Sequence, residues 1–65
     1  MEKATLKALR VNCGLTLEEA SQKLGISIYT LSSYENGKTY PNIPIIQKMI
    51  KLYHTEFDRI NFLCK

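Results

Sequence analysis

The sequence has few of the residues from which disulfide frameworks, metal sites and catalytic centres are built. It contains two cysteines and one histidine, too few for a disulfide framework and without the clustering that indicates a metal site. We therefore expect Cys13 and Cys64 to be free thiols and His54 to be a turn residue. A Ser/His/Asp grouping, a glycine-rich phosphate loop and a plausible carboxylate pair are also missing. These absences predict a protein that is not an enzyme and has no metal, no cofactor and no small-molecule ligand.

Long apolar runs are absent as well. No segment approaches the roughly 20 apolar residues that span a membrane, and the N-terminus lacks the apolar core of a signal peptide. These absences predict a cytoplasmic protein in a reducing environment, with no membrane partner. What remains is a chain of 65 residues, of which 45% are hydrophobic, and this suits one small globular domain. We expect residues 1–65 to form that single domain.

Basic residues outnumber acidic ones. The chain has nine lysines and arginines against six aspartates and glutamates, giving a net charge of +3 and a pI near 9.0. A basic balance of this kind suits a polyanionic partner such as nucleic acid. The lysines are scattered along the chain, however, and scattered lysines usually serve solubility, so the charge alone assigns no contacts.

Apolar residues recur at helical spacing along the whole chain, and no alternating strand pattern competes with them. The pattern predicts an all-α fold, a compact five-helix domain without strands. Capping residues and glycines divide it into helices over about 2–13, from Thr16, from Ser27, from Asn42 and from Thr55 or Glu56. The fifth helix is expected to bury Phe57, Ile60 and Cys64.

The stretch 16–41, TLEEASQKLGISIYTLSSYENGKTYP, contains two short helical patterns joined by a glycine turn. Thr16 and Glu19 form a capping box at the start of the first helix, and Gly25 supplies the positive φ that a sharp turn needs. Two helices joined in this way can set the second one into the major groove of DNA. Helical spacing gives that second helix an inward face of Thr30, Leu31, Tyr34 and Glu35, and an outward face of Ile28, Tyr29, Ser32, Ser33 and Asn36.

These segments resemble the Cro/repressor-type helix-turn-helix family (XRE, lambda-repressor-like) of phage and bacterial regulators. The matching segments are LKALR, GLTLEEASQKLGIS and YENGKTYP, with the Glu-Asn-Gly-Lys-x-x-Pro run at the correct distance from the glycine turn. The resemblance implies a lambda-repressor-like five-helix fold, a recognition helix that begins after Ser27, and a protein encoded by a bacterium or a phage. It also implies a partly buried ion pair between Arg10 and Glu35, for which two solvated surface charges are the alternative.

The sequence departs from the family pattern at five positions. Leu17 stands where a glutamine often bonds a phosphate, and Ile28 and Tyr29 occupy a face on which polar or basic residues are common. Ala20 and Ser21 replace the usual Leu-Ala pair, which changes the packing at the centre of the motif. We expect these departures to change the strength of DNA binding and to leave the fold unchanged.

The outward face of the expected recognition helix offers Ile28, Tyr29, Ser32 and Ser33 as base-reading residues. It has no Arg, Lys or Gln, so the bidentate contacts that discriminate bases best are unavailable. Contact of Ile28 with thymine methyl groups and single hydrogen bonds from the other three residues remain. For Ile28, packing at the helix edge against Leu17 or Leu31 is the alternative. Affinity would then come mostly from phosphates, for which the candidates are Thr16, Leu17, Ser27, Asn36, Gly37, Lys38, Thr39 and Tyr40.

The leading hypothesis is a sequence-specific transcriptional regulator, a Cro-like repressor that binds double-stranded DNA as a homodimer. One such domain covers a half-site, so the operator would be pseudo-palindromic. Phe62 and Leu63 are candidates for the dimer interface because Phe62 is expected to point away from Phe57, with folding back onto the domain as the alternative. A second hypothesis is a protein-interaction module, antitoxin-like or anti-repressor-like, that binds a protein through Ile28 and Tyr29.

Overall fold

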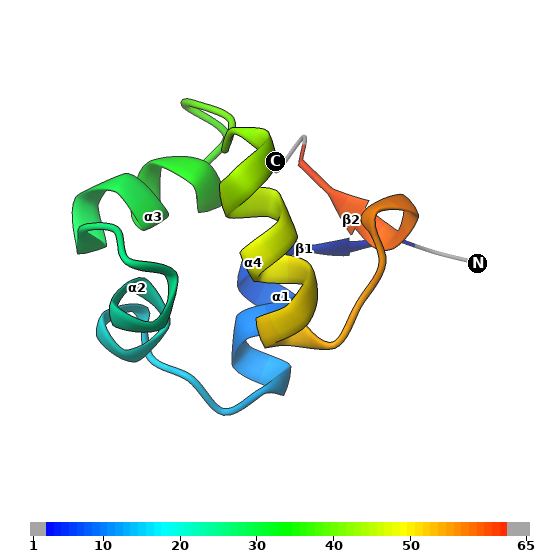
Figure 1. Cartoon of the computed structure of the whole chain (residues 1–65), viewed down its shortest axis with the longest axis horizontal. Coiled ribbons are helices and arrows are strands. Elements are labelled where there is room, and N and C mark those ends of the chain that lie inside the picture. Colours follow the sequence, from blue (N-terminus) through cyan, green and yellow to red (C-terminus); the bar gives the residue numbers. More distant parts are fainter. Residues whose placement is uncertain (1–2, 63–65) are drawn as a thin grey trace.

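The computed structural model describes residues 3–62 and consists, over that range, of four α-helices, one short 3-10 helix and two short strands. In chain order these elements are β1 (Ala4–Thr5), α1 (Leu6–Asn12), α2 (Leu17–Leu24), α3 (Ile28–Glu35), α4 (Ile43–Tyr53), the 3-10 helix η1 (Phe57–Arg59) and β2 (Ile60–Asn61). Helices α1 and α4 lie in the middle of the molecule, with α2 and α3 on one side and the strands on the other (Figure 1). None of the helices within residues 3–62 has the length and apolar character needed to cross a membrane.

Each α-helix begins at a residue whose side-chain oxygen accepts a hydrogen bond from the backbone N–H three positions later. The N···O distance is 3.1 Å at Thr5, Thr16 and Ser27 and 3.0 Å at Asn42. Such a bond satisfies one of the N–H groups that the first turn of a helix leaves unpaired. The sequence predicts the last three of these caps but misses Thr5, so α1 starts at Leu6 and not near residue 2.

Two of the helices end in the left-handed conformation. Gly25 closes α2 at φ 73°, where a residue without Cβ is strongly preferred. His54 closes α4 at φ 54°, and it is the one non-glycine residue with positive φ within residues 3–62. The interpretation of His54 as a turn residue is therefore confirmed.

The hydrophobic core gathers side chains from every α-helix and from β2. Helix α4 contributes Met49 and Tyr53, and α3 contributes Leu31, all three buried. Between α2 and its neighbours the residue Ala20 is fully buried, and its small side chain lets the helices approach closely. The buried cluster comprises Leu6, Ala20, Leu24, Leu31, Met49, Tyr53 and Ile60.

The helical class expected from the sequence is confirmed, but the fifth helix and the absence of strands are wrong. Thr55 donates its N–H to the carbonyl of Ile50 and so completes the end of α4. Glu56 makes no side-chain capping bond, and only the 3-10 helix η1 follows. Phe57, expected to be buried, is 53% exposed. Cys64, also placed on that helix, lies outside the described residues.

Ile60 is buried as expected, but as part of a strand. It pairs in parallel with Ala4, and Asn61 pairs with Thr5. As the cap of α1, Thr5 has an extended backbone, which is the conformation that pairing in a strand requires. Ile60 is β-branched, and such residues are favoured in strands.

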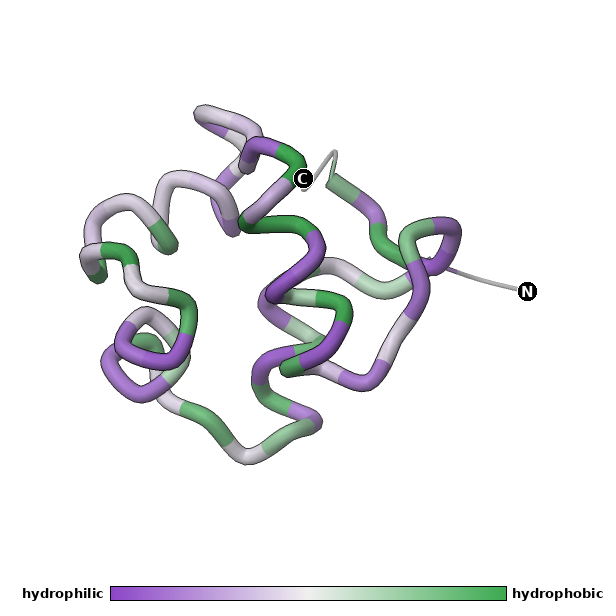
Figure 2. The backbone as a smooth tube through the Cα atoms, in the orientation of Figure 1, coloured by the Kyte–Doolittle hydropathy of each residue, from purple (hydrophilic) through white to green (hydrophobic). Residues whose placement is uncertain are grey.

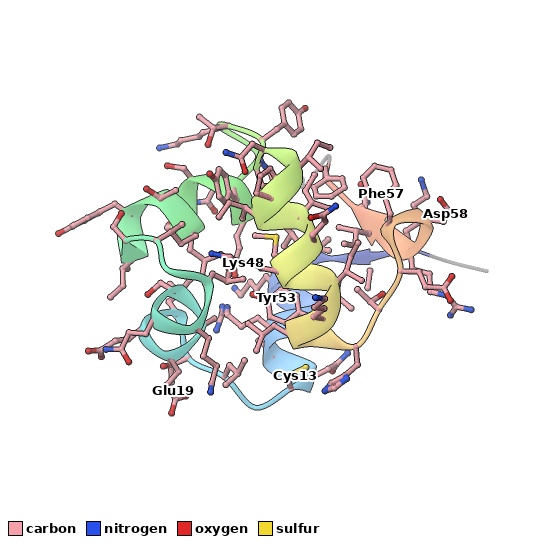
Figure 3. All side chains as sticks on the ribbon, viewed as in Figure 1. Cys13, Glu19, Lys48, Tyr53, Phe57 and Asp58 are labelled. Carbon is pink, nitrogen blue, oxygen red and sulfur yellow. The ribbon has the colours of Figure 1, made fainter. Side chains whose placement is uncertain are left out.

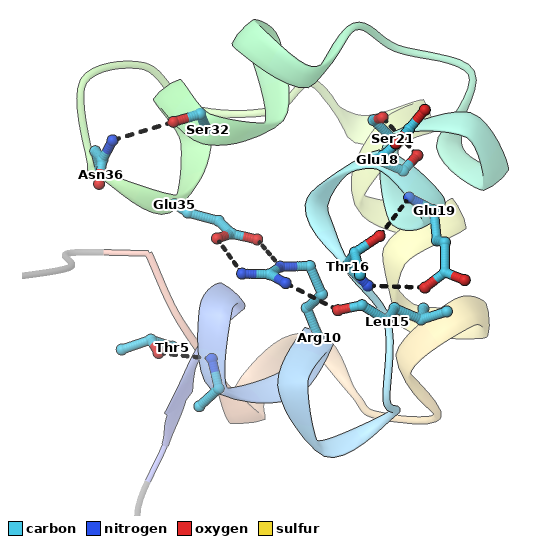
Figure 4. Close-up of polar contacts among 11 residues, drawn as sticks. Thr5, Arg10, Leu15, Thr16, Glu18, Glu19, Ser21, Ser32, Glu35 and Asn36 are labelled. Atoms are coloured by element: carbon cyan, nitrogen blue, oxygen red, sulfur yellow. Dashed lines mark hydrogen bonds and ion pairs between the residues drawn. The ribbon is translucent and has the colours of Figure 1, made fainter.

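The main polar contact inside the fold joins α1 to α3. Arg10 Nε lies 2.8 Å from Glu35 Oε2, and Arg10 Nη2 lies 3.2 Å from Glu35 Oε1, with both side chains buried (Figure 4). Arg10 Nη1 also donates to the carbonyl of Leu15, 2.8 Å away. The hydrogen bond to Glu35 raises the pKa of Arg10 above its ordinary value, against the opposing effect of burial.

A second buried polar group lies beside this pair. Tyr53 is 3% exposed, and its hydroxyl has no hydrogen-bond partner among the described residues. It lies on the inner side of α4 (Figure 3). Burial, with a further contribution from the negative charge of Glu35, raises the pKa of Tyr53 to about 12.

We predict that Glu35→Ala lowers the free energy of unfolding by about 3–5 kcal/mol, because it leaves the guanidinium of Arg10 buried without its partner. Urea unfolding followed by circular dichroism measures the change. Glu18→Ala is the matched control, because Glu18 is an exposed glutamate, and it should change stability by well under about 1 kcal/mol. Equal effects of the two substitutions would contradict the prediction.

We also predict that Tyr53→Phe leaves stability at neutral pH within about 1 kcal/mol of the original, because the hydroxyl it removes makes no hydrogen bond. The raised pKa means that the folded state favours the neutral phenol. The resulting stabilisation of the fold is complete below about pH 10 and is lost as the pH rises toward about 12. Tyr53→Phe should therefore lose less stability over that range than the original protein. Parallel alkaline unfolding curves for the two proteins would contradict this assignment.

Candidate nucleic-acid interface

Helices α2 and α3 form a compact pair on one side of the molecule. The turn between them is fixed by two backbone hydrogen bonds, from the N–H of Gly25 to the carbonyl of Gln22 and from the N–H of Ile26 to the carbonyl of Ser21. A Cβ at Gly25 would have room, since the nearest atom would be Lys48 Nζ at 3.8 Å. The positive φ, and not crowding, is thus what favours glycine here.

Helix α3 has one buried face and one exposed face. Leu31 and Glu35 are buried, whereas Tyr29 is 85% exposed and Ile28 is 40% exposed. Ser32 and Ser33 are half-buried beside them. The two-faced arrangement read from the sequence is therefore present, and its two most accessible large side chains occupy adjacent positions in the first turn.

Several polar groups of α3 bond to one another. The amide of Asn36 donates to Ser32 Oγ across 3.3 Å (Figure 4), and Ser27 Oγ donates to Thr30 Oγ1 across 2.9 Å. The members of each pair are three or four residues apart, the spacing of a helical cap or turn, so the sequence itself contains a signal for both bonds. These bonds leave fewer groups ready to meet a base edge.

The exposed face of α3 carries no charge. The helix contains no basic residue, and the carboxylate of its one acidic residue, Glu35, is buried against Arg10. In Figure 2 most of α3 has intermediate hydropathy, in contrast to the strongly hydrophilic stretches of α2. Any attraction to a polyanion must therefore come from residues around α3.

The loop after α3 supplies one such charge. Lys38 is exposed, as are Thr39, Tyr40 and Asn36. The backbone N–H of Gly37, which the sequence offered to a phosphate, instead donates to the carbonyl of Tyr34. That of Lys38 donates to the carbonyl of Ser33, so in this loop the side chains are the groups left to contact a partner.

The start of α2 is less suited to an anion. Thr16 and Glu19 form the reciprocal capping box, with Glu19 Oε1 3.0 Å from the N–H of Thr16 (Figure 4). Glu18 is exposed beside them, and the side chain of Glu19 lies on the outer side of α2 (Figure 3). Leu17 is half-buried against the core. Two negative charges at this helix N-terminus oppose the attraction that its dipole offers to a phosphate.

The candidate dimer residues lie apart from α3. Phe62 is half-buried against the core and does not point away from Phe57, because the two ring centroids are 5.8 Å apart. Phe57 lies near the strands, on the other side of the molecule from α3 (Figure 3). Leu63 falls outside the described residues. Within residues 3–62 no cluster of residues could hold a metal ion.

Comparison with known proteins agrees with this geometry. The sequence profile of the helix-turn-helix family matches residues 6–60, so the chain belongs to the helix-turn-helix family, of the Cro/repressor (XRE) type.

Among individual proteins, the chain is 38% identical over 48 residues to a protein of Sulfurisphaera tokodaii provisionally named an HTH-type transcriptional regulatory protein. That match covers 74% of this chain but only 16% of the relative. No solved structure matches the chain.

Proposed function

We propose that this chain is a sequence-specific DNA-binding transcriptional regulator whose helix α3 enters the major groove. The observation that carries the proposal is the accessible first turn of α3, with Tyr29 85% exposed, in a chain of the helix-turn-helix family. In this class the first residues of the second helix reach the base edges. The net charge of +3 favours approach to DNA.

The contacts divide into two groups. Ile28, Tyr29, Ser32 and Ser33 face the bases, while Lys38, Thr39, Tyr40 and Asn36 contact phosphates from the loop after α3. Ser27 and the first N–H groups of α3 add phosphate contacts at the start of the recognition helix. Thr16, Leu17 and Gly37 contribute least, because the first two lie beside Glu18 and Glu19 and the N–H of Gly37 is already bonded.

A Cro-like repressor that binds a pseudo-palindromic operator as a homodimer is the finer form of this proposal. One α3 reads only a half-site, so two copies are needed for a full operator. The contact between the copies is proposed at Phe62 and Leu63. Phe62 itself packs against the core, so among the described residues of this region the accessible apolar group is the ring of Phe57, 53% exposed beside Phe62.

The test is selection of duplexes from a random DNA library by the 65-residue chain, followed by affinity measurements at two salt concentrations. Enrichment of one motif, with affinity that falls steeply as salt increases, is the expected result. If the chain retains no duplex DNA even at low salt, the proposal is wrong.

For Lys38→Ala we predict weaker binding to all duplexes alike and a salt slope shallower by roughly one unit, as expected when one phosphate contact is lost. Lys51→Ala is the matched control, since Lys51 is an exposed lysine in the last turn of α4, and it should leave the slope unchanged. A change in the preferred sequence at constant slope would mean that Lys38 reads bases.

For Tyr29→Ala we predict a loss of about 1–3 kcal/mol in specific binding, the scale of one good base contact. Non-specific binding should change little, because the side chain is uncharged, and the fold should be retained, because the side chain is exposed. Tyr29→Phe separates the hydroxyl from the ring. Equal losses for specific and non-specific duplexes would place Tyr29 on the DNA backbone.

A second candidate function is a protein-interaction module that uses the same face. The uncharged surface of α3 with exposed Ile28 and Tyr29 favours it, because exposed aromatic side chains are enriched where proteins bind one another. In that case Tyr29→Ala would abolish capture of a protein partner while the chain bound no DNA.

A further inference from the structure

The residue types on the first turn of α3 point to a particular chemical feature of DNA. Ile28 and Tyr29 are adjacent and exposed, and neither side chain is charged. We propose that α3 reads the C5-methyl groups of pyrimidines in the major groove, so that its preferred sites carry thymine opposite Ile28 and Tyr29. This inference rests on the proposed DNA-binding function and specifies what the recognition helix detects.

Helix α3 lacks the side chains that recognise bases by paired hydrogen bonds. Bidentate recognition of guanine uses Arg or Lys, and that of adenine uses Asn or Gln. Helix α3 has none of these within residues 28–35, and the amide of Asn36, which follows it, donates to Ser32 Oγ. Purine edges therefore find no side chain on α3 that can form a bidentate contact.

Some hydroxyl groups near the start of α3 already form hydrogen bonds within the protein. Thr30 Oγ1 accepts from Ser27 Oγ, which itself accepts from the N–H of Thr30. Among the outward side chains, the hydroxyls of Tyr29 and Ser33 remain for single hydrogen bonds. Ser32 Oγ accepts from Asn36 and keeps its O–H as a donor. Single bonds discriminate weakly between bases that share donors or acceptors, so they do not define a site alone.

The thymine methyl group is the apolar feature that the major groove displays. Covering one methyl group with an apolar side chain favours binding by about fourfold, from the transfer free energy of one buried carbon. The 40% of Ile28 that is accessible and the ring of Tyr29 provide that apolar cover. The same reasoning applies to 5-methylcytosine, which carries its methyl group at the equivalent ring position.

The experiment uses the duplex pool that the chain selects from a random library made with thymine. The selected and unselected pools are each copied with deoxyuridine triphosphate in place of thymidine triphosphate, which removes the C5-methyl group and leaves the base-pairing groups unchanged. We expect the affinity for the selected pool to fall by about fourfold for each methyl group covered. The affinity for the unselected pool should stay the same.

The variant Ile28→Ala with Tyr29→Ala shows whether these side chains detect the methyl group. It should bind the thymine and deoxyuridine pools equally. The control is Lys51→Ala, a change of an exposed residue in the last turn of α4 outside the proposed interface, and it should keep the difference. A circular dichroism spectrum and the affinity for unselected DNA establish that the double variant is folded. Removing thymine methyl groups also alters duplex flexibility, so a difference that persisted in the double variant would overturn the proposal.

A second selection uses a library in which 5-methylcytosine replaces cytosine. We expect it to admit 5-methylcytosine at positions where the ordinary library requires thymine. Specific binding that is unaffected by deoxyuridine would overturn the methyl-reading proposal while leaving DNA binding intact. Failure to retain any duplex would instead overturn the proposed function, so the two failures are distinguishable.

Discussion

The contact between Arg10 and Glu35 is the constraint on which the arrangement of helix α3 depends. Two of the guanidinium nitrogens meet the carboxylate, and the third meets the carbonyl of Leu15 just before α2. A single side chain on α1 thereby contacts α3 and the segment that leads into α2. Since two buried charges are tolerated only when they are paired with good geometry, this contact restricts how α3 can turn relative to α1.

The same contact determines the electrostatic character of the exposed face. Glu35 is the acidic residue of α3, and placing it on the inner face removes a negative charge that would repel DNA. The outer face is left with hydroxyls, an isoleucine and a tyrosine. The positive charge of Lys38 thus lies in the loop, while the accessible apolar groups lie on the helix. In the proposed complex the loop would attract the DNA and the helix would discriminate between bases.

The sequence predicted the helical part of the fold well, because local signals determine it. Thr16, Ser27 and Asn42 each cap a helix through a bond to a residue three positions away, so a short window contains the information. The pairing of Ala4 with Ile60 was missed for the opposite reason. Strands of two residues are too short to show alternation, and their partner lies at the far end of the sequence.

The candidate site, like the fold, was predicted where it depends on local sequence patterns. The faces of α3 followed from helical spacing, and exposure of Tyr29 agrees with them. The engagement of the Gly37 N–H by the end of α3 was missed because it depends on how the backbone turns after Asn36. Likewise, the orientation of Phe62 toward Phe57 depends on the β1–β2 pairing, which short-range patterns do not contain.

The strand pair has a consequence for how the chain assembles. Ala4 and Ile60 are separated by nearly the whole domain, so their contact closes a loop that contains all four helices. Closing so long a loop has an entropic cost that nearby contacts do not bear. The hydrogen bonds within α1, α2 and α3 join residues close in the sequence and do not require this loop to close. Ile60 fills its place in the core when the loop closes, so the interior of the domain is completed by a contact between distant parts of the sequence.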